Sequence, residues 1–290
     1  MRRLTEEEAS AAFDALMGAQ GGALREAMFA LSLGRSAEEA GLSTARALGW
    51  VDHGLTALGQ LIADPLREFG FWLARERQLP SESLVPDLQR QRYAGKRVVE
   101  VGSGGGCNLL SLSGLPASLV GVEPMPVYLQ MMPVLAKIAG LPCPEAVEAS
   151  ARAMPLPDRS ADLVLCYSSH QYMDVRAALR EMHRVLAPGG ELVIVGNSLV
   201  PFGSETVTRF ARGRSLGTLK YDLTAIANTM SYQFAGRRLF QGRGGTSTAV
   251  PIYPTRAFMR DALDDTGFTL AAHRVRALPS GETALFAIKR

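Results

Sequence analysis

The chain has 290 residues, of which 47% are hydrophobic and 20% are charged, which are typical values for a soluble globular protein. This composition excludes disorder over the whole length. The three cysteines are scattered, which excludes a disulfide-stapled scaffold and favours a reducing, cytoplasmic location. With no apolar run of 18 residues and a polar first segment, we expect neither a membrane span nor secretion.

Charge is unevenly distributed along the chain. Residues 1–95 carry 10 basic and 13 acidic side chains, whereas residues 200–260 carry 9 basic and 2 acidic ones. A local basic excess often faces an anionic partner or substrate. A solvated lid or an oligomer contact would have the same composition, so both interpretations stay open.

Residues 1–92 are predicted to form a helical segment. Thr5 and Glu8 have the spacing of a capping box at the start of a helix. A fourth helix is expected from about residue 55 to 77, interrupted near Pro65. Residues 36–63 resemble a helix-turn-helix or winged-helix unit, but the acidic balance of the segment argues against binding of nucleic acid. Two roles remain for it: a cap over an active site, or a homodimer contact.

Residues 93–290 are predicted to form an α/β domain. Short Val-, Leu- and Ile-rich runs at 97–102, 118–124, 162–168 and 191–197 have the pattern of strands buried on both faces. Helical segments at 127–139 and 175–186 separate them, which predicts a parallel sheet with right-handed crossovers. The last two runs, 268–278 and 282–290, flank a Pro-Ser-Gly turn and predict a terminal antiparallel hairpin.

A glycine-rich turn follows the first of these strands. The spacing is Glu100-x-Gly102-x-Gly104-x-Gly106, and Cys107 occupies the position where a dinucleotide-binding fingerprint would require its third glycine. Glycines at such a turn allow the backbone to approach a ligand closely.

This pattern resembles the first motif of the class I S-adenosylmethionine (SAM) methyltransferases, and further motifs of that family recur in order over residues 95–200. The resemblance implies a Rossmann-like, mostly parallel seven-stranded sheet and SAM as the cofactor. It also implies that Glu100 supports the methionine ammonium, and that Gly102, Ser103 and Gly104 lie under the methionine and the ribose.

The resemblance assigns the other end of the cofactor to the next two strands. Glu123, 23 residues after Glu100, closes the second strand, where a carboxylate can accept both ribose hydroxyls. Pro124 is expected to pack on the adenine. Ser150 stands where the family has an adenine-binding aspartate, and Ala151 follows it; a hydroxyl is a weaker acceptor than a carboxylate.

Candidate catalytic residues follow the fourth strand, at 167–172, because this loop lies beside the reactive methyl group in the resembled fold. His170 is a candidate general base, with an ordinary pKa near neutrality. Tyr167 and Tyr172 are candidates to face the sulfonium, and Ser168 is assigned to the cofactor. The alternatives are that His170 only hydrogen-bonds the backbone or the SAM ribose, and that the tyrosines are packing residues. The dispersed histidines predict no metal site.

Residues 179–190 match the family's "L-x-E-x-x-R-V-L-x-P-G-G" helix and turn, for which we expect an architectural role. Residues 198–254 are expected to be an inserted specificity element. Its glycines Gly242, Gly244 and Gly245 suggest a closing loop. Its aromatic side chains and arginines suit an anionic or aromatic small molecule, or the insert's own small core. They are Phe202, Phe210, Tyr221, Tyr232, Phe234, Phe240, Arg209, Arg212, Arg214, Arg237, Arg238 and Arg243.

The sequence therefore predicts a SAM-dependent methyltransferase acting on a small molecule, in specialised metabolism. One alternative shares the fold: an enzyme that resembles azetidine-2-carboxylate synthases, which cyclise SAM itself and release methylthioadenosine. Another is a transcription regulator that senses SAM, which the acidic N-terminal segment disfavours.

Overall fold

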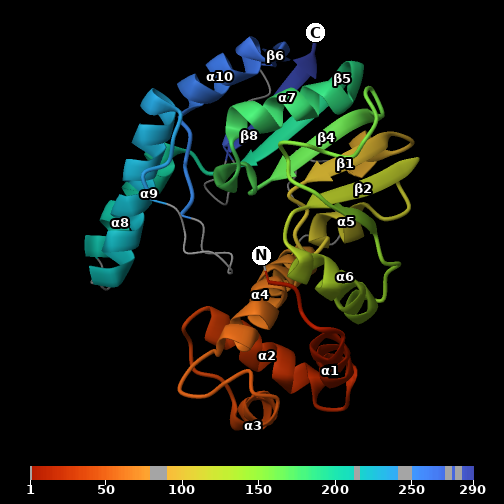
Figure 1. Cartoon of the computed structure of the whole chain (residues 1–290), viewed down its shortest axis with the longest axis vertical. Coiled ribbons are helices and arrows are strands. Elements are labelled where there is room, and N and C mark those ends of the chain that lie inside the picture. Colours follow the sequence, from red (N-terminus) through yellow and green to blue (C-terminus); the bar gives the residue numbers. More distant parts are fainter. Residues whose placement is uncertain (1, 79–89, 212–215, 241–249, 272–275, 278–282) are drawn as a thin grey trace. The chain divides into compact units, whose positions relative to one another are not determined.

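A computed structural model describes residues 2–78, 90–211, 216–240, 250–271, 276–277 and 283–290 of the chain (Figure 1). The chain forms two compact units, and each contains segments from distant parts of the sequence. The first contains the stretches Met1–Gly95 and Ser103–Glu148, and the second contains Lys96–Gly102, Ala149–Gly244 and Thr248–Arg290.

The first unit begins with four helices: α1 (Glu6–Met17), α2 (Gly21–Ser32), α3 (Glu39–Ala47) and α4 (Ala57–Gln78). The capping box at Thr5 and Glu8 is confirmed, since each side chain bonds the other's main-chain N–H. The predicted interruption at Pro65 is wrong, because α4 is one continuous helix. Proline removes a single N–H donor, and the buried positions around it, 61–66, hold the helix in the packed interior.

The rest of the first unit comes from the α/β part of the sequence: α5 (Cys107–Leu112), β2 (Ser118–Glu123), α6 (Pro126–Ala139) and β3 (Glu145–Glu148). The N-terminal helices pack on it. The Trp72 indole of α4 donates to Ser111 Oγ of α5 at 2.7 Å. The amide of Gln130 on α6 bonds both main-chain groups of Leu4. The N-terminal segment and this half of the α/β layer therefore share one core.

The second unit contains the central strands. They are β1 (Arg97–Val101), β4 (Ala161–Tyr167), β5 (Leu186–Gly196), β6 (Phe268–Leu270), β7 (Arg276–Ala277) and β8 (Thr283–Lys289). Strand β4 pairs in parallel with β1 and with β5, and β8 runs antiparallel to β5. Leu163, Val164 and Leu165 of β4 are fully buried, which confirms the prediction of a strand covered on both faces.

The described strands are ordered β3-β2-β1-β4-β5-β8-β6. β6 pairs with one end of β8 and β7 with the other, both antiparallel, so together they occupy a single position in the order. The predicted fold class is thus confirmed: a Rossmann-like, mostly parallel sheet of seven strand positions that ends in antiparallel strands.

Helix α7 (Val175–Val185) carries the glutamate and arginine of the predicted architectural motif. Its Arg184 donates to the main-chain oxygens of Met154 and Leu156 and pairs with Asp158 and Glu181. Glu181 in turn accepts from the Met154 N–H at 2.9 Å. The motif holds the loop before β4 against the helix.

The remaining helices of the second unit are η2 (His170–Tyr172), α8 (Leu199–Ala211), α9 (Leu216–Ala235) and α10 (Arg256–Asp265). Helices α8 and α9 lie side by side within the insert (Figure 1). A short η1 (Arg90–Tyr93) precedes β1. In the part of the chain that the structure describes, every helix is too short or too polar to cross a bilayer.

Candidate functional site

The first half of the glycine turn lies in the second unit, at the end of β1. Glu100 is buried in that strand. Gly102 has φ +74°, and a Cβ there would come within 2.4 Å of the Ser169 Cβ. Ser169 in turn donates its hydroxyl to the Val101 oxygen at 2.8 Å. Only glycine fits at position 102, because both the backbone conformation and the neighbouring loop exclude a side chain.

The second half of the turn lies in the first unit, together with the end of β2. The Gly104 N–H donates to Glu123 Oε2 at 2.9 Å, and the Met125 N–H donates to Glu123 Oε1 at 2.9 Å. Burial raises the pKa of the Glu123 carboxyl, and the two main-chain hydrogen bonds oppose that shift. Pro124 is half-buried beside it.

Ser103 lies between the two glycines and is buried. Its N–H donates to the Val122 oxygen, and its hydroxyl lies so close to Gly121 that a Cβ there would be 2.5 Å away. The hydroxyl has no hydrogen-bond partner among the residues that the structure describes.

Ser150 and Ala151 differ in exposure. Ser150 is exposed and accepts from the Arg152 N–H at 3.3 Å, so it closes a tight local turn, whereas Ala151 is buried. The proposed contact of Ser150 with adenine remains a prediction.

The turn fits an adenosyl ligand on its own geometry. Gly102 and Gly104 both have left-handed φ values, +74° and +54°, so the chain presents main chain where a side chain would otherwise stand. Each oxygen of Glu123 holds one N–H and retains a lone pair for a ligand hydroxyl.

The loop after β4 has unusual backbone geometry. Ser168 is a non-glycine residue with φ +48°, and its N–H donates to the Val195 oxygen at 2.8 Å. Strained positions of this kind persist where the surrounding structure over-determines them, and they cluster at functional sites. Tyr167 is half-buried and Tyr172 is 47% exposed.

His170 belongs to this loop, and its side chain is buried against the end of β5. A Cβ on Gly196 would lie 2.4 Å from its Cε1 atom. Its Nδ1 atom is buried without a hydrogen-bond partner among the described residues. Burial lowers the pKa of His170 to about 4. The pKa in the folded chain thus lies below the ordinary value of histidine, and near pH 7 this imidazole is neutral. The role of general base remains a prediction.

The insert is anchored to the same loop by two side chains. The Tyr232 hydroxyl of α9 donates to Asp174 Oδ1 at 2.9 Å, and Asp174 also caps α7. The Arg238 guanidinium donates to the main-chain oxygens of Gln171, Met173 and Val250 at 2.8–3.0 Å.

The other aromatic side chains of the insert divide into two groups. Phe202 stacks on Tyr253 with ring centroids 3.9 Å apart, in a small core with Ala225, so the alternative interpretation holds for this residue. Tyr221, Phe234 and Phe240 are exposed. The side chains of Arg209 and Phe210 fall outside the described residues. So do the predicted loop glycines and three further arginines, which are Gly242, Gly244, Gly245, Arg212, Arg214 and Arg243.

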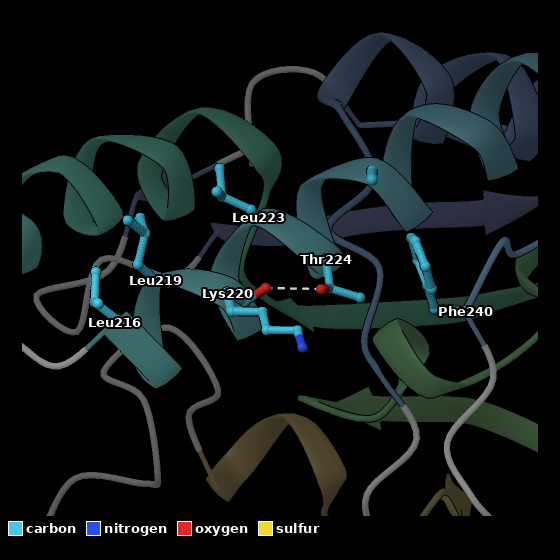
Figure 2. Close-up of a pocket in the computed structure, with 7 residues that line it drawn as sticks. Leu216, Leu219, Lys220, Leu223, Thr224 and Phe240 are labelled. Carbon is cyan, nitrogen blue, oxygen red and sulfur yellow. Dashed lines mark hydrogen bonds between the residues drawn. The ribbon is translucent and has the colours of Figure 1, made fainter.

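A shallow apolar groove of about 370 Å³ runs along α9 (Figure 2). Leu216, Leu219 and Leu223 line it together with Phe240, and Lys220 contributes a cation. Thr224 donates its hydroxyl to the Lys220 main-chain oxygen at 2.7 Å.

Sequence reasoning missed two residues beside the glycine turn. Glu68 of α4 lies against Gly104, and Tyr128 of α6 donates its hydroxyl to Glu68 Oε1 at 2.9 Å. A glutamate in a helical, acidic segment carries no local signal that it lies beside the glycine turn. Its hydrogen-bond partner, Tyr128, is 60 positions away in the sequence. Among the described residues no group of three His, Cys, Asp or Glu side chains could hold a metal ion.

A known protein family matches this part of the chain. Residues 99–194, which contain both halves of the glycine turn and the loop after β4, match the family model described as "Methyltransferase domain". Residues 99–194 therefore resemble a methyltransferase domain. SAM is the cofactor of this family, in agreement with the prediction from the glycine turn.

Two relatives match part of this chain. An uncharacterized methyltransferase, YcgJ of Bacillus subtilis, is 31% identical over 35% of the chain and 41% of its own length. Demethylmenaquinone methyltransferase of Thermus thermophilus is 35% identical over 35% of the chain and 47% of its own length. The chain thus spans less than half the length of these relatives.

The fold also matches solved structures. A SAM-dependent methyltransferase from Methanosarcina mazei superposes with a TM-score of 0.51 at 18% identity, over 71% of this chain and 98% of that one. At this identity the match concerns the fold alone.

Proposed function

We propose that the protein is a SAM-dependent methyltransferase that acts on a small molecule. The observation that carries the proposal is the placement of Glu123 at the end of β2, bonded to the Gly104 N–H of the glycine turn at 2.9 Å. A carboxylate with one lone pair left on each oxygen can accept both hydroxyls of a ribose. The charge-assisted bonds this forms are stronger than those of a neutral acceptor.

SAM supplies an activated methyl group when bound, so the protein has to position the acceptor and exclude water. The residues that do so are proposed to lie at 167–174. Ser168 turns the loop through its left-handed backbone conformation, and the neutral side chain of His170 is buried within the same loop. Tyr167 and Tyr172 are the side chains of this loop that an acceptor could meet, since one is half-buried and the other exposed.

An anionic or aromatic substrate is supported by the insert. Arg237 and Tyr221 are exposed there, and the α9 groove combines apolar walls with Lys220. Aromatic rings bind planar molecules, and the planar guanidinium of arginine binds carboxylates. The insert thus offers the complementary chemistry, and we assign it the specificity role predicted from the sequence.

The N-terminal helices are proposed to serve as a wall of the cofactor site rather than as a dimer contact. Two observations support this choice. Helix α4 brings Glu68 against Gly104, and among the described side chains of α1–α4 only Phe71 is a large apolar group that is exposed. A dimer interface would need a larger apolar patch.

Calorimetric titration with SAM and with adenosylhomocysteine tests the proposal. The wild-type chain should bind both, and Glu123→Ala should weaken both by at least tenfold, since the ribose acceptor is lost. Glu145→Ala, at an exposed carboxylate on the neighbouring β3, is the matched control and should bind as the wild type does. Failure of the wild type to bind either compound would contradict the proposal.

Product analysis then identifies the reaction. Incubation with SAM and a panel of aromatic and carboxylated acceptors should release adenosylhomocysteine in step with a methylated product. Methylthioadenosine formed from SAM alone would instead indicate cyclisation of SAM.

A further inference from the structure

Glu68 brings a second carboxyl to the glycine turn. Its Oε2 atom lies 2.5 Å from the position that a Cβ on Gly104 would take, and its Oε1 accepts the Tyr128 hydroxyl at 2.9 Å. Gly104 also donates its N–H to Glu123, at 2.9 Å. Two carboxyls from different elements therefore flank one glycine within the first unit.

The electrostatic surroundings of Glu68 disfavour its charge. From the end of β2 it faces Glu123, from α6 it faces Tyr128, and on its own helix it faces Asp64 and Arg67. The single cation of this group is shared, because Arg67 Nη1 lies 3.3 Å from Asp64 Oδ1. Burial is the largest effect and raises the pKa of Glu68 to about 7, while the Tyr128 hydrogen bond and Arg67 oppose it.

We propose that Glu68 belongs to the cofactor site and is protonated when an adenosyl ligand binds, so that binding takes up a proton from solvent wherever Glu68 is ionised in the unliganded chain. The proposal rests on the proposed function, since it places the ligand on the glycine turn. A ligand there adds to the burial of the Glu68 carboxyl, which further penalises the charged form. The protonated Oε2 can then donate to the ligand, and Oε1 keeps its bond from Tyr128.

Titration of adenosylhomocysteine between pH 6.0 and pH 8.0 tests this coupling. If only protonated Glu68 accepts the ligand, the affinity of the wild type falls by up to about tenfold over this range. Glu68→Gln keeps the shape and the acceptor for Tyr128 but cannot ionise, so its affinity should stay flat and match the wild type at pH 6.0. Glu26→Gln, at an exposed carboxylate on α2, is the control and should keep the wild-type slope.

A second variant tests the same coupling without changing Glu68. Tyr128→Phe removes a hydrogen bond that lowers the pKa of Glu68, so the loss of affinity should begin at higher pH. If Glu68→Gln does not fold, as judged by circular dichroism, this variant decides. A flat wild-type profile, or an unchanged slope in Glu68→Gln, would overturn the proposal. Absence of any binding at pH 6.0 would instead count against the proposed function.

Discussion

Arg238 Nη2 donates a hydrogen bond to the main-chain oxygen of Gln171 at 3.0 Å, between residues 67 positions apart in the sequence. The same guanidinium reaches the oxygens of Met173 and Val250. A planar fork with several donors can hold three carbonyl groups at once. Arg238 therefore fastens the part of the insert that follows α9 to the loop that carries the candidate catalytic residues.

Replacement of this arginine should impair turnover more than cofactor binding. We expect Arg238→Ala to lower kcat/KM by about 10- to 100-fold, because a displaced loop loses the geometry of the acceptor site. Arg238→Lys should recover only part of this loss, since the three N–H donors of an ammonium share one nitrogen and lack the planar spread of the guanidinium. SAM affinity, measured by calorimetry, should stay within about twofold of the wild type.

Arg237 provides the matched control for this experiment. It has the same charge, adjoins Arg238 and is exposed. Arg237→Ala should leave kcat/KM near the wild-type value for an uncharged acceptor. Equal losses in the two variants would show that charge, and not the clamp, is what the reaction needs.

Gly102 should tolerate no side chain. In Gly102→Ala the new Cβ meets Ser169 at 2.4 Å, in addition to about 1 kcal/mol of strain from the left-handed backbone. We expect a loss of about 2–4 kcal/mol in the free energy of unfolding and a loss of SAM binding. Denaturant unfolding and calorimetry measure the two effects.

Gly114 separates the two causes. It has φ +78°, and nothing lies within 4 Å of the position of its Cβ. Gly114→Ala should therefore cost only the backbone strain, about 1 kcal/mol, and leave SAM binding intact. A Gly102→Ala variant as stable as Gly114→Ala would contradict the crowding argument.

His170 should make stability depend on pH in the acid range. Its pKa is about 4 in the folded chain and near 6.5 when unfolded, so the unfolded chain binds the extra proton between these values. The contribution is fully present above pH 6.5 and is lost as the pH falls toward 4, by at most about 3 kcal/mol. His170→Gln should lose less stability over this window, as urea unfolding at pH 4.5 and pH 7.0 would show. Parallel curves for both proteins would rule out this role of His170.

The strands and the glycine turn could be predicted because their signals are local. A buried parallel strand needs a continuous apolar run, and a tight turn into a ligand needs glycine, so β1, β2, β4 and β5 lie where the pattern placed them. Glu123 could be placed at a strand end for the same reason, whereas its bond to Gly104 was found in the structure. The assignment of Glu123 to ribose remains a proposal.

Other features escaped because their causes are not local. The pKa of His170 depends on its burial against β5, which the sequence of its own loop does not encode. Helix α4 continues through Pro65 because tertiary packing outweighs one missing donor. Glu68 resembles any other acidic residue of a helical segment until the fold brings it to Gly104.

The amino-acid sequence alone was enough to predict the fold class, the positions of the main strands and the resemblance to the methyltransferases, because hydrophobic period and glycine spacing are properties of neighbouring residues. Only the tertiary structure decided which distant groups meet: Glu68 with Gly104 and Tyr128, and Arg238 with the loop after β4. Charge, burial and hydrogen bonding act through space rather than along the chain, and the shifted pKa values of Glu68 and His170 arise from contacts of that kind.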